Sequence, residues 1–267
     1  MRYGRLAIAL GCLVALLGSG PILAIATGAV DLQADWRTGS RAPVGLAPSP
    51  RDHPEAVVQV YAARALAWRG AFGVHTWIAV KDRDGERYRR YEVIGWRHYR
   101  GLPAVSVNRR PPDGRWYGSR PQLLADLRGL EAERAIEGID AAARSYPYAK
   151  RYRVWPGPNS NTFTAHVVRR VPELRVHFPS TAVGKDYLPG AVAARAPSGS
   201  GYQFNLFGLL GVTAARVEGL ELNLLGLNLG LAPSPPTLKL PGLGHVPLFD
   251  TDDRRNAPAP RGAQEDA

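Results

Sequence analysis

The sequence predicts an α+β protein with an antiparallel sheet, packed helices, a C-terminal β meander and an N-terminal transmembrane helix. Three observations predict this class: an uncharged run at the start of the chain, strand-like segments followed by helical ones in the middle, and a leucine- and glycine-rich block near the end. Hydrophobic residues make up 45% of the 267 residues, which is enough for a sizeable core. The single cysteine, Cys12, excludes an intrachain disulfide and a cysteine-rich metal site.

The first segment is a candidate membrane anchor. Residues 6–30 carry no charge, and a helix needs only about 20 residues to cross a bilayer. Arg2 and Arg5 precede this run, so the positive-inside rule predicts a cytoplasmic N-terminus and an exported main domain. The alternative is a signal peptide cleaved near residues 24–26. We favour the uncleaved anchor because the run is long, and we expect the membrane to be a partner through this helix.

The net charge of +11 lies mostly in the middle of the chain, where residues 71–153 carry an excess of +7. A basic surface can bind nucleic acid, anionic lipid or a glycan, or can simply be solvated. Because the domain is expected outside the cytoplasm, we predict no nucleic-acid partner.

Composition divides the remainder of the chain. A stretch with Ala-Pro steps and no periodic pattern follows the anchor, and an Asp-, Arg- and Pro-rich stretch ends the chain. The predicted units are an anchor or signal segment (1–30), a Pro-rich linker (31–53), an α+β domain (54–190), a β meander packed on it (191–249) and a disordered tail (250–267).

The α+β domain begins with strands. Alternating, Val- and Tyr-rich segments predict strands over 56–64 and 72–80, and Asp84-Gly85 predicts a hairpin turn that leads to a return strand over 87–96. Residues 104–109 are a candidate fourth strand.

Helices are predicted in the second half of the domain. Ser119 can cap a helix with Pro121 in its first turn, and residues 131–145 have apolar side chains at helical spacing. A further helix is predicted over 159–170, where Pro172 stops it.

The leucine- and glycine-rich block at 202–231 predicts two or three short antiparallel strands with one apolar face. Leu220, Leu222 and Leu224 fall on one strand face, and the leucines of 227–231 on another. We expect the meander to pack its apolar face on the domain core. The alternative is an apolar surface that lies on lipid or holds an acyl chain.

A nucleophile, a base and an orienting group can be drawn from this pattern. Ser160 begins a predicted helix, His75 lies within a predicted strand, and Glu92 lies on the return strand. Free N–H groups at a helix N-terminus stabilise an oxyanion. The alternatives are a capping hydroxyl for Ser160 and an ordinary core or surface role for His75. We expect no metal and no cofactor, because His166 and His177 have no partners at metal-binding spacing.

Several motifs resemble those of circularly permuted papain-like domains of the NlpC and deSUMOylase types. These motifs are Val58-Gln-Val60-Tyr61, Val74-His75-Thr76-Trp77, Tyr91–Gly95 and Asn159-Ser160-Asn161-Thr162-Phe163. The resemblance implies a papain-like antiparallel sheet with packed helices, His75 as catalytic base and position 160 as nucleophile. This chain has Ser160 where that superfamily has cysteine, and a serine hydroxyl is a far weaker acid than a thiol.

A second resemblance, to a bacterial membrane-associated family of unknown function, is longer. Its landmarks are VVQVYAAR (57–64), VHTWIAVK (74–81), WPGPNSNTF (155–163), GKDYL (184–188) and LKLPGLG (238–244). It brings no assigned activity. Together with the charges around the apolar run, it predicts a single-pass protein of the bacterial inner membrane with a periplasmic main domain.

Three functions follow from these observations. The first is a degenerate papain-like site that binds an envelope peptide, glycan or lipid. The second is a Ser–His hydrolase or acyltransferase that uses Ser160, His75 and Glu92. The third is a structural envelope protein whose meander contacts lipid. The candidate ligand-contacting residues are Asn159, Asn161, Trp77 and Trp155.

Overall fold

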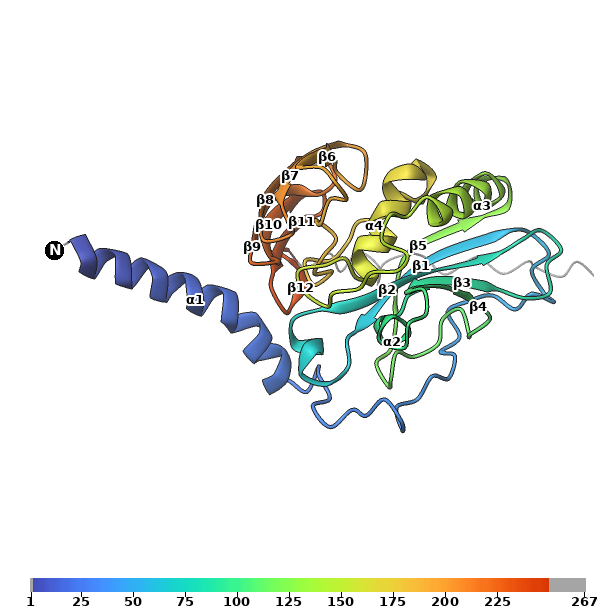
Figure 1. Ribbon diagram of the computed structural model, residues 1–267, viewed down its shortest axis with the longest axis horizontal. Helices are drawn as coiled ribbons and strands as arrows, with labels where there is room; N and C mark the ends of the chain where they lie inside the picture. The colour runs from blue at the N-terminus through green and yellow to red at the C-terminus, as the bar shows by residue number, and fades with distance from the viewer. Residues whose placement is uncertain (1, 250–267) are drawn as a thin grey trace, which may run out of the picture.

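The computed structural model describes residues 2–249, and the predicted disordered tail lies outside the described residues (Figure 1). Two antiparallel sheets and their helices form the body, so the predicted α+β class and the C-terminal meander are confirmed. The first sheet has five strands in the order β4-β3-β2-β1-β5, and the second has seven in the order β12-β11-β10-β9-β8-β7-β6.

The first sheet contains most of the strands predicted from the sequence. Its strands are β1 (Val57–Arg64), β2 (Val74–Lys81), β3 (Arg89–Val93), β4 (Val105–Asn108) and β5 (Gln122–Arg128).

Two expectations in this sheet were wrong. The segment after Pro121 is strand β5, which pairs with β1. Leu127 packs in the apolar cluster on one face of the sheet and Leu123 packs against the cluster on the other face, so these leucines do not form the apolar side of a helix. The return strand β3 ends at Val93, and the connection to it is longer than Asp84-Gly85 alone.

Two helices cover one face of this sheet. α3 (Gly129–Arg144) and α4 (Ser160–Arg170) pack on the alternate residues of β1 and β2 that include Val58, Val60 and Ile78. Both helices were predicted within a residue or two. The short helices are η1 (Ala67–Ala71), α2 (Gly95–Tyr99) and η2 (Pro172–Leu174).

The opposite face of the first sheet is covered by the segment predicted as a spacer. The Asp113 carboxylate accepts hydrogen bonds from the backbone N–H groups of Val44, Leu46 and Ala47 at 2.6–3.3 Å. Leu46 and Ala47 then pack on a second apolar cluster that includes Trp77. This segment is therefore part of the folded body, held by the buried Asp113 carboxylate and by further hydrogen bonds such as that from Tyr88 to the carbonyl of Pro48.

The second sheet is the C-terminal meander, and each of its strands pairs with the next along the chain. Its strands are β6 (Ala193–Arg195), β7 (Gly201–Leu206), β8 (Leu210–Ala215), β9 (Gly219–Leu224), β10 (Leu227–Pro233), β11 (Pro236–Leu240) and β12 (Gly244–Pro247).

The N-terminal helix α1 (Arg2–Ala26) projects from the end of the body at which the second sheet lies (Figure 1). Among residues 2–249, it is the one helix long and apolar enough to cross a membrane, by length and composition. Its last turns contact the body, where Ala24 is buried with Val30 and Ala71 and packs near Leu243.

Candidate functional site

The residue predicted as the base, His75, lies in a buried polar cluster. Its Nε2 atom lies 3.0 Å from Oε2 of Glu92, which also accepts from Arg90 at 2.9 Å. Asn108 donates to the other carboxylate oxygen at 2.9 Å. The ring of His75 stacks on Trp116, with centroids 3.5 Å apart and planes at 12°. The structure therefore brings His75 and Glu92 together.

Charge and burial fix the protonation of this pair. Burial would raise the pKa of Glu92, but Arg90 and His75 lower it to about 2, so the group is a carboxylate near neutral pH. Burial lowers the pKa of His75 and outweighs the opposing effect of Glu92. His75 is therefore neutral near pH 7 and donates its Nε2–H to Glu92, because a carboxylate can only accept.

The structure does not bring Ser160 to His75. Thr76, the next residue on β2, donates to Oδ1 of Asn161 and to Oγ1 of Thr164 at 3.0 Å, so α4 packs on the face of Thr76. Successive side chains of a strand point to opposite faces, and His75 packs with Trp77 on the other face. Within residues 2–249, no hydrogen bond joins Ser160 to His75.

The helix N-terminus at Ser160 is occupied by its own cap. Oδ1 of Asn159 accepts from the backbone N–H groups of Asn161 and Thr162 at 2.9 and 3.2 Å. These N–H groups are the ones that an oxyanion hole at this position would need. Nδ2 of Asn161 donates to the carbonyls of Val74 and Val183. Asn159 and Asn161 thus tie α4 to its neighbours.

The two tryptophans predicted to contact a ligand have different surroundings. Trp77 is fully buried, stacks on Tyr61 and donates its Nε1–H to the carbonyl of Pro112 at 2.7 Å. Trp155 is half exposed and donates to the carbonyl of Leu225, at a turn of the second sheet.

The second sheet exposes its apolar face, so the prediction that this face packs on the domain core was wrong. Phe204, Leu220 and Leu222 are 58%, 59% and 46% exposed. The register pairs apolar residues in rows across four strands, so all of them share one face. We call this surface the apolar face; its residues are Tyr202, Phe204, Leu206, Leu210, Val212, Ala214, Leu220, Leu222, Leu224, Leu227, Leu229 and Leu231.

Two hairpin tips extend the apolar face at one end. Phe207 and Leu225 are 75% and 61% exposed and have φ angles of 54° and 53°, a conformation that bulky side chains rarely adopt. The turns are held from inside, where the Asn205 and Asn223 amide oxygens accept from the backbone N–H groups that follow the tips. An Asn-Leu-x-Gly-Leu repeat at 205–209 and 223–227 encodes both turns.

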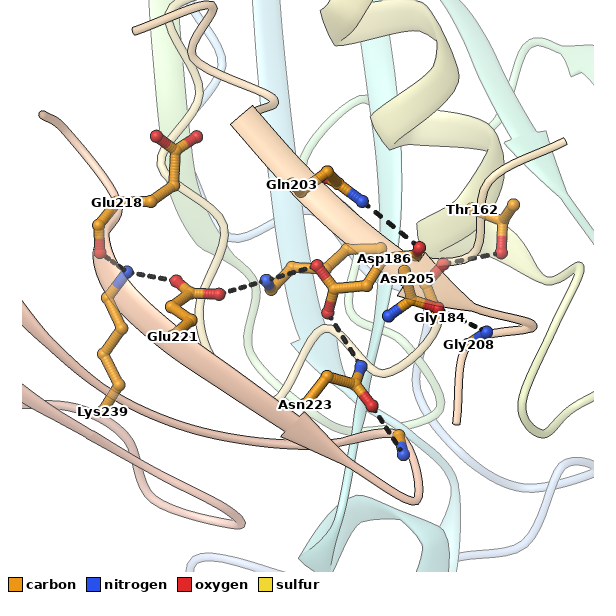
Figure 2. A network of polar contacts seen from close by, with 12 residues as sticks. Thr162, Gly184, Asp186, Gln203, Asn205, Gly208, Glu218, Glu221, Asn223 and Lys239 are labelled. Carbon is orange, nitrogen blue, oxygen red and sulfur yellow. Dashed lines mark hydrogen bonds and ion pairs between the residues drawn. The ribbon is translucent and has the colours of Figure 1, made fainter. Parts of the chain in front are cut away.

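The inner face of the second sheet is polar, as Figure 2 shows. Lys185 bridges the Asp186 and Glu221 carboxylates, and Lys239 donates to Glu221 and to the carbonyl of Glu218. Asn223 donates to Oδ2 of Asp186 at 3.1 Å. We call Lys185, Asp186, Glu221 and Lys239 the buried network. It joins the loop after α4 to the sheet and gives the GKDYL segment a structural role.

The charges of this network compensate one another. Burial would lower the pKa of Lys185, but Asp186 and Glu221 raise it above its usual value. Burial would likewise raise the pKa of Glu221, but Lys185 and Lys239 lower it to about 2. Lys185 and Glu221 are therefore ionised near neutral pH, whereas burial lowers the pKa of Lys239 and outweighs the opposing effect of Glu221.

Together these features define a class: an α+β domain with a helix long enough to span a membrane and a sheet that exposes its apolar side. Residues 55–187 match a family model described as a protein of unknown function (DUF3750), which is consistent with an uncharacterised family. The match covers the first sheet, α3 and α4 and stops before the second sheet. The chain has no significant similarity to a curated protein or to a solved structure.

Proposed function

We propose that this chain is a membrane-anchored protein of the bacterial envelope whose second sheet lies on the lipid surface. The observation that carries the proposal is the apolar face, which has twelve positions without a charged side chain. Monomeric soluble proteins rarely expose contiguous apolar patches of more than a few hundred Å². A bilayer is the occupant that fits, because it accepts a broad apolar surface with no complementary shape.

The position of α1 supports a lipid occupant over a protein partner. The helix packs against the turn between β11 and β12: a Cβ atom on Gly20 would lie 1.9 Å from the carbonyl oxygen of Pro241. α1 therefore leaves the body at the end where the second sheet lies, and its apolar residues such as Leu10 and Val14 are exposed. A helix that crosses the bilayer brings this end of the body to the membrane surface.

Polar side chains at the edge of the apolar face suit the headgroup region. Arg195 on β6 pairs with Tyr202 at the end of its row, and the Arg195 guanidinium lies 5.9 Å from the ring of Tyr202. Trp155 lies at the opposite end, beside Leu225. Arginine and tryptophan are both favoured at the membrane–water boundary.

The proposed orientation rests on the charges at the start of α1. Arg2 and Arg5 precede the apolar run, and this supports a cytoplasmic N-terminus with the two sheets on the periplasmic side of the inner membrane.

The test is a fluorescence measurement on the full chain in phospholipid vesicles. Cys12→Ser removes the native thiol, and Leu222→Cys then carries an environment-sensitive fluorophore on the apolar face. Val107→Cys on β4 is the matched control, because Val107 is similarly exposed (54% against 46% for Leu222) and lies in the other sheet. We expect a blue-shifted emission and quenching by brominated lipid at position 222 alone.

Equal emission and equal quenching at the two positions would exclude lipid contact. Chemical cross-linking of position 222 to a second protein, with no lipid quenching, would instead indicate a protein partner.

A further inference from the structure

A second site lies on the first sheet, on the face away from α4. A small cavity of about 100 Å³ is lined by seven residues, four of them arginines. The lining residues are Arg41, Arg90, Arg110, Pro111, Arg115, Trp116 and Tyr117. They come from the segment after α1, from β3 and from the loop that follows β4, so the fold assembles the cavity from three separate parts of the chain.

Positive charge at this cavity is not balanced within the described part of the chain. The ion pairs of its arginines go to one acidic residue, Glu92, from Arg90 at 2.9 Å and from Arg110 at 3.9 Å. Arg41 and Arg115 donate to backbone carbonyls, which carry no net charge. Four arginines therefore line the cavity, and one carboxylate pairs with two of them.

Glu92 itself is already engaged. Its Oε2 atom accepts from His75 and Arg90, and its Oε1 atom accepts from Asn108. It therefore neutralises part of the charge but does not occupy the cavity as a ligand would.

One of the lining arginines keeps a donor without a partner. Arg90 is 2% exposed, and its Nε atom is buried without a hydrogen-bond partner in residues 2–249. A buried donor without a partner costs free energy. The Trp77 and Trp116 rings hold this guanidinium, with centroids 4.0 and 5.6 Å from its Cζ atom.

We infer that the cavity binds a single phosphate group, presented as a phosphate ester. Guanidinium groups bind phosphate and carboxylate oxygens through paired N–H donors. A phosphate monoester offers three oxygens and up to two negative charges, and this matches four arginines beside one carboxylate better than a singly charged carboxylate does. The aromatic rings of Trp116 and Tyr117 form an apolar wall for the group that carries the ester.

The test is isothermal titration calorimetry on the full chain in detergent micelles, with inorganic phosphate, glycerol phosphate and acetate as probes. Arg110→Gln and Arg115→Gln each remove one charge from the partly exposed rim of the cavity. Arg109→Gln is the matched control, because Arg109 is an exposed neighbour that does not line the cavity. We expect either phosphate probe to bind more tightly than acetate, and each rim variant to weaken it about tenfold or more. We expect the control to change affinity less than about twofold.

Nanodiscs distinguish the two sources of such a group. If the full chain prefers phosphatidic acid to phosphatidylcholine nanodiscs and ignores glycerol phosphate, the phosphate comes from a lipid headgroup. Binding of glycerol phosphate in micelles identifies a soluble or polymeric ester. The inference is overturned if no phosphate source binds better than acetate, or if Arg110→Gln and Arg115→Gln behave like Arg109→Gln.

Discussion

The two sheets of this protein use the same alternation of apolar and polar side chains and place it in opposite senses. In the first sheet, Ile78 packs against the helices and its neighbour Trp77 packs against the opposite cluster, so both faces are covered. In the second sheet, Glu221 points inward to the buried network and Leu222 points outward. The alternation thus determines which side chains share a face of a sheet. The residues of the body that pack on the sheet determine which of the two faces turns inward.

The largest effect is expected from breaking the polar side of the second sheet. Glu221→Leu leaves Lys185 and Lys239 buried with one fewer carboxylate between them, and it should lower the free energy of unfolding by about 3–5 kcal/mol. Chemical denaturation of the full chain in micelles, followed by tryptophan fluorescence, measures this loss. Leu222→Ser, one residue along the same strand, is the control and should cost less than about 1 kcal/mol. Equal losses would mean that the polar face does not hold the sheet.

A matched pair of truncations tests the comparison directly. Ile78→Ala opens a cavity in a fully buried core and should cost about 2–4 kcal/mol, whereas Leu222→Ala on the apolar face should cost less than about 0.5 kcal/mol in micelles. Thermal unfolding monitored by circular dichroism gives both values. A large loss at Leu222 would show that the apolar face is covered by protein.

A smaller effect is expected on acidification. Burial lowers the pKa of His166, His177 and His245 to about 4, below the value of about 6.5 expected in the unfolded chain. The unfolded chain therefore takes up more protons, and stability is complete above about pH 6.5 and falls as the pH drops towards 4, by about 1 kcal/mol per pH unit for a fully buried histidine. Denaturation at pH 7.5, 6 and 5 measures the slope.

Two of these histidines lie together at the second sheet, whereas His166 lies in α4, which packs on the first sheet. The His177 and His245 rings lie 4.3 Å apart, and His245 belongs to β12. Replacing both by Phe should remove more of the acid slope than replacing His166 in α4. The opposite ranking would place the acid sensitivity in the first sheet and its helices.

Local patterns in the sequence were sufficient to predict many of the helices and strands. Helical spacing predicted α3, and the Asn159 cap with Pro172 beyond it bounded α4. The β5 strand was missed because a Ser119 cap and Pro121 fit a helix start equally well, and only pairing with β1 decides between them.

The candidate site was harder to predict. Strand position allowed Glu92 to reach His75, and the two are in contact. Which face of β2 meets α4 depends on tertiary packing, so the separation of Ser160 from His75 could not be read from spacing. The outward direction of the apolar face had a usable signal: the positions that alternate with its leucines are Glu221, Asn223 and Asn228, and Lys185 supplies the ionic partner of Glu221.

The contact between Gly20 and Pro241 has a consequence for biogenesis. The two residues are far apart in the sequence, so α1 is synthesised long before the strands that it packs against exist. Under the proposed function, α1 would enter the bilayer first and the second sheet would be completed last, next to the lipid. A bulky residue at Gly20 would then leave the first sheet intact but disturb this final packing step.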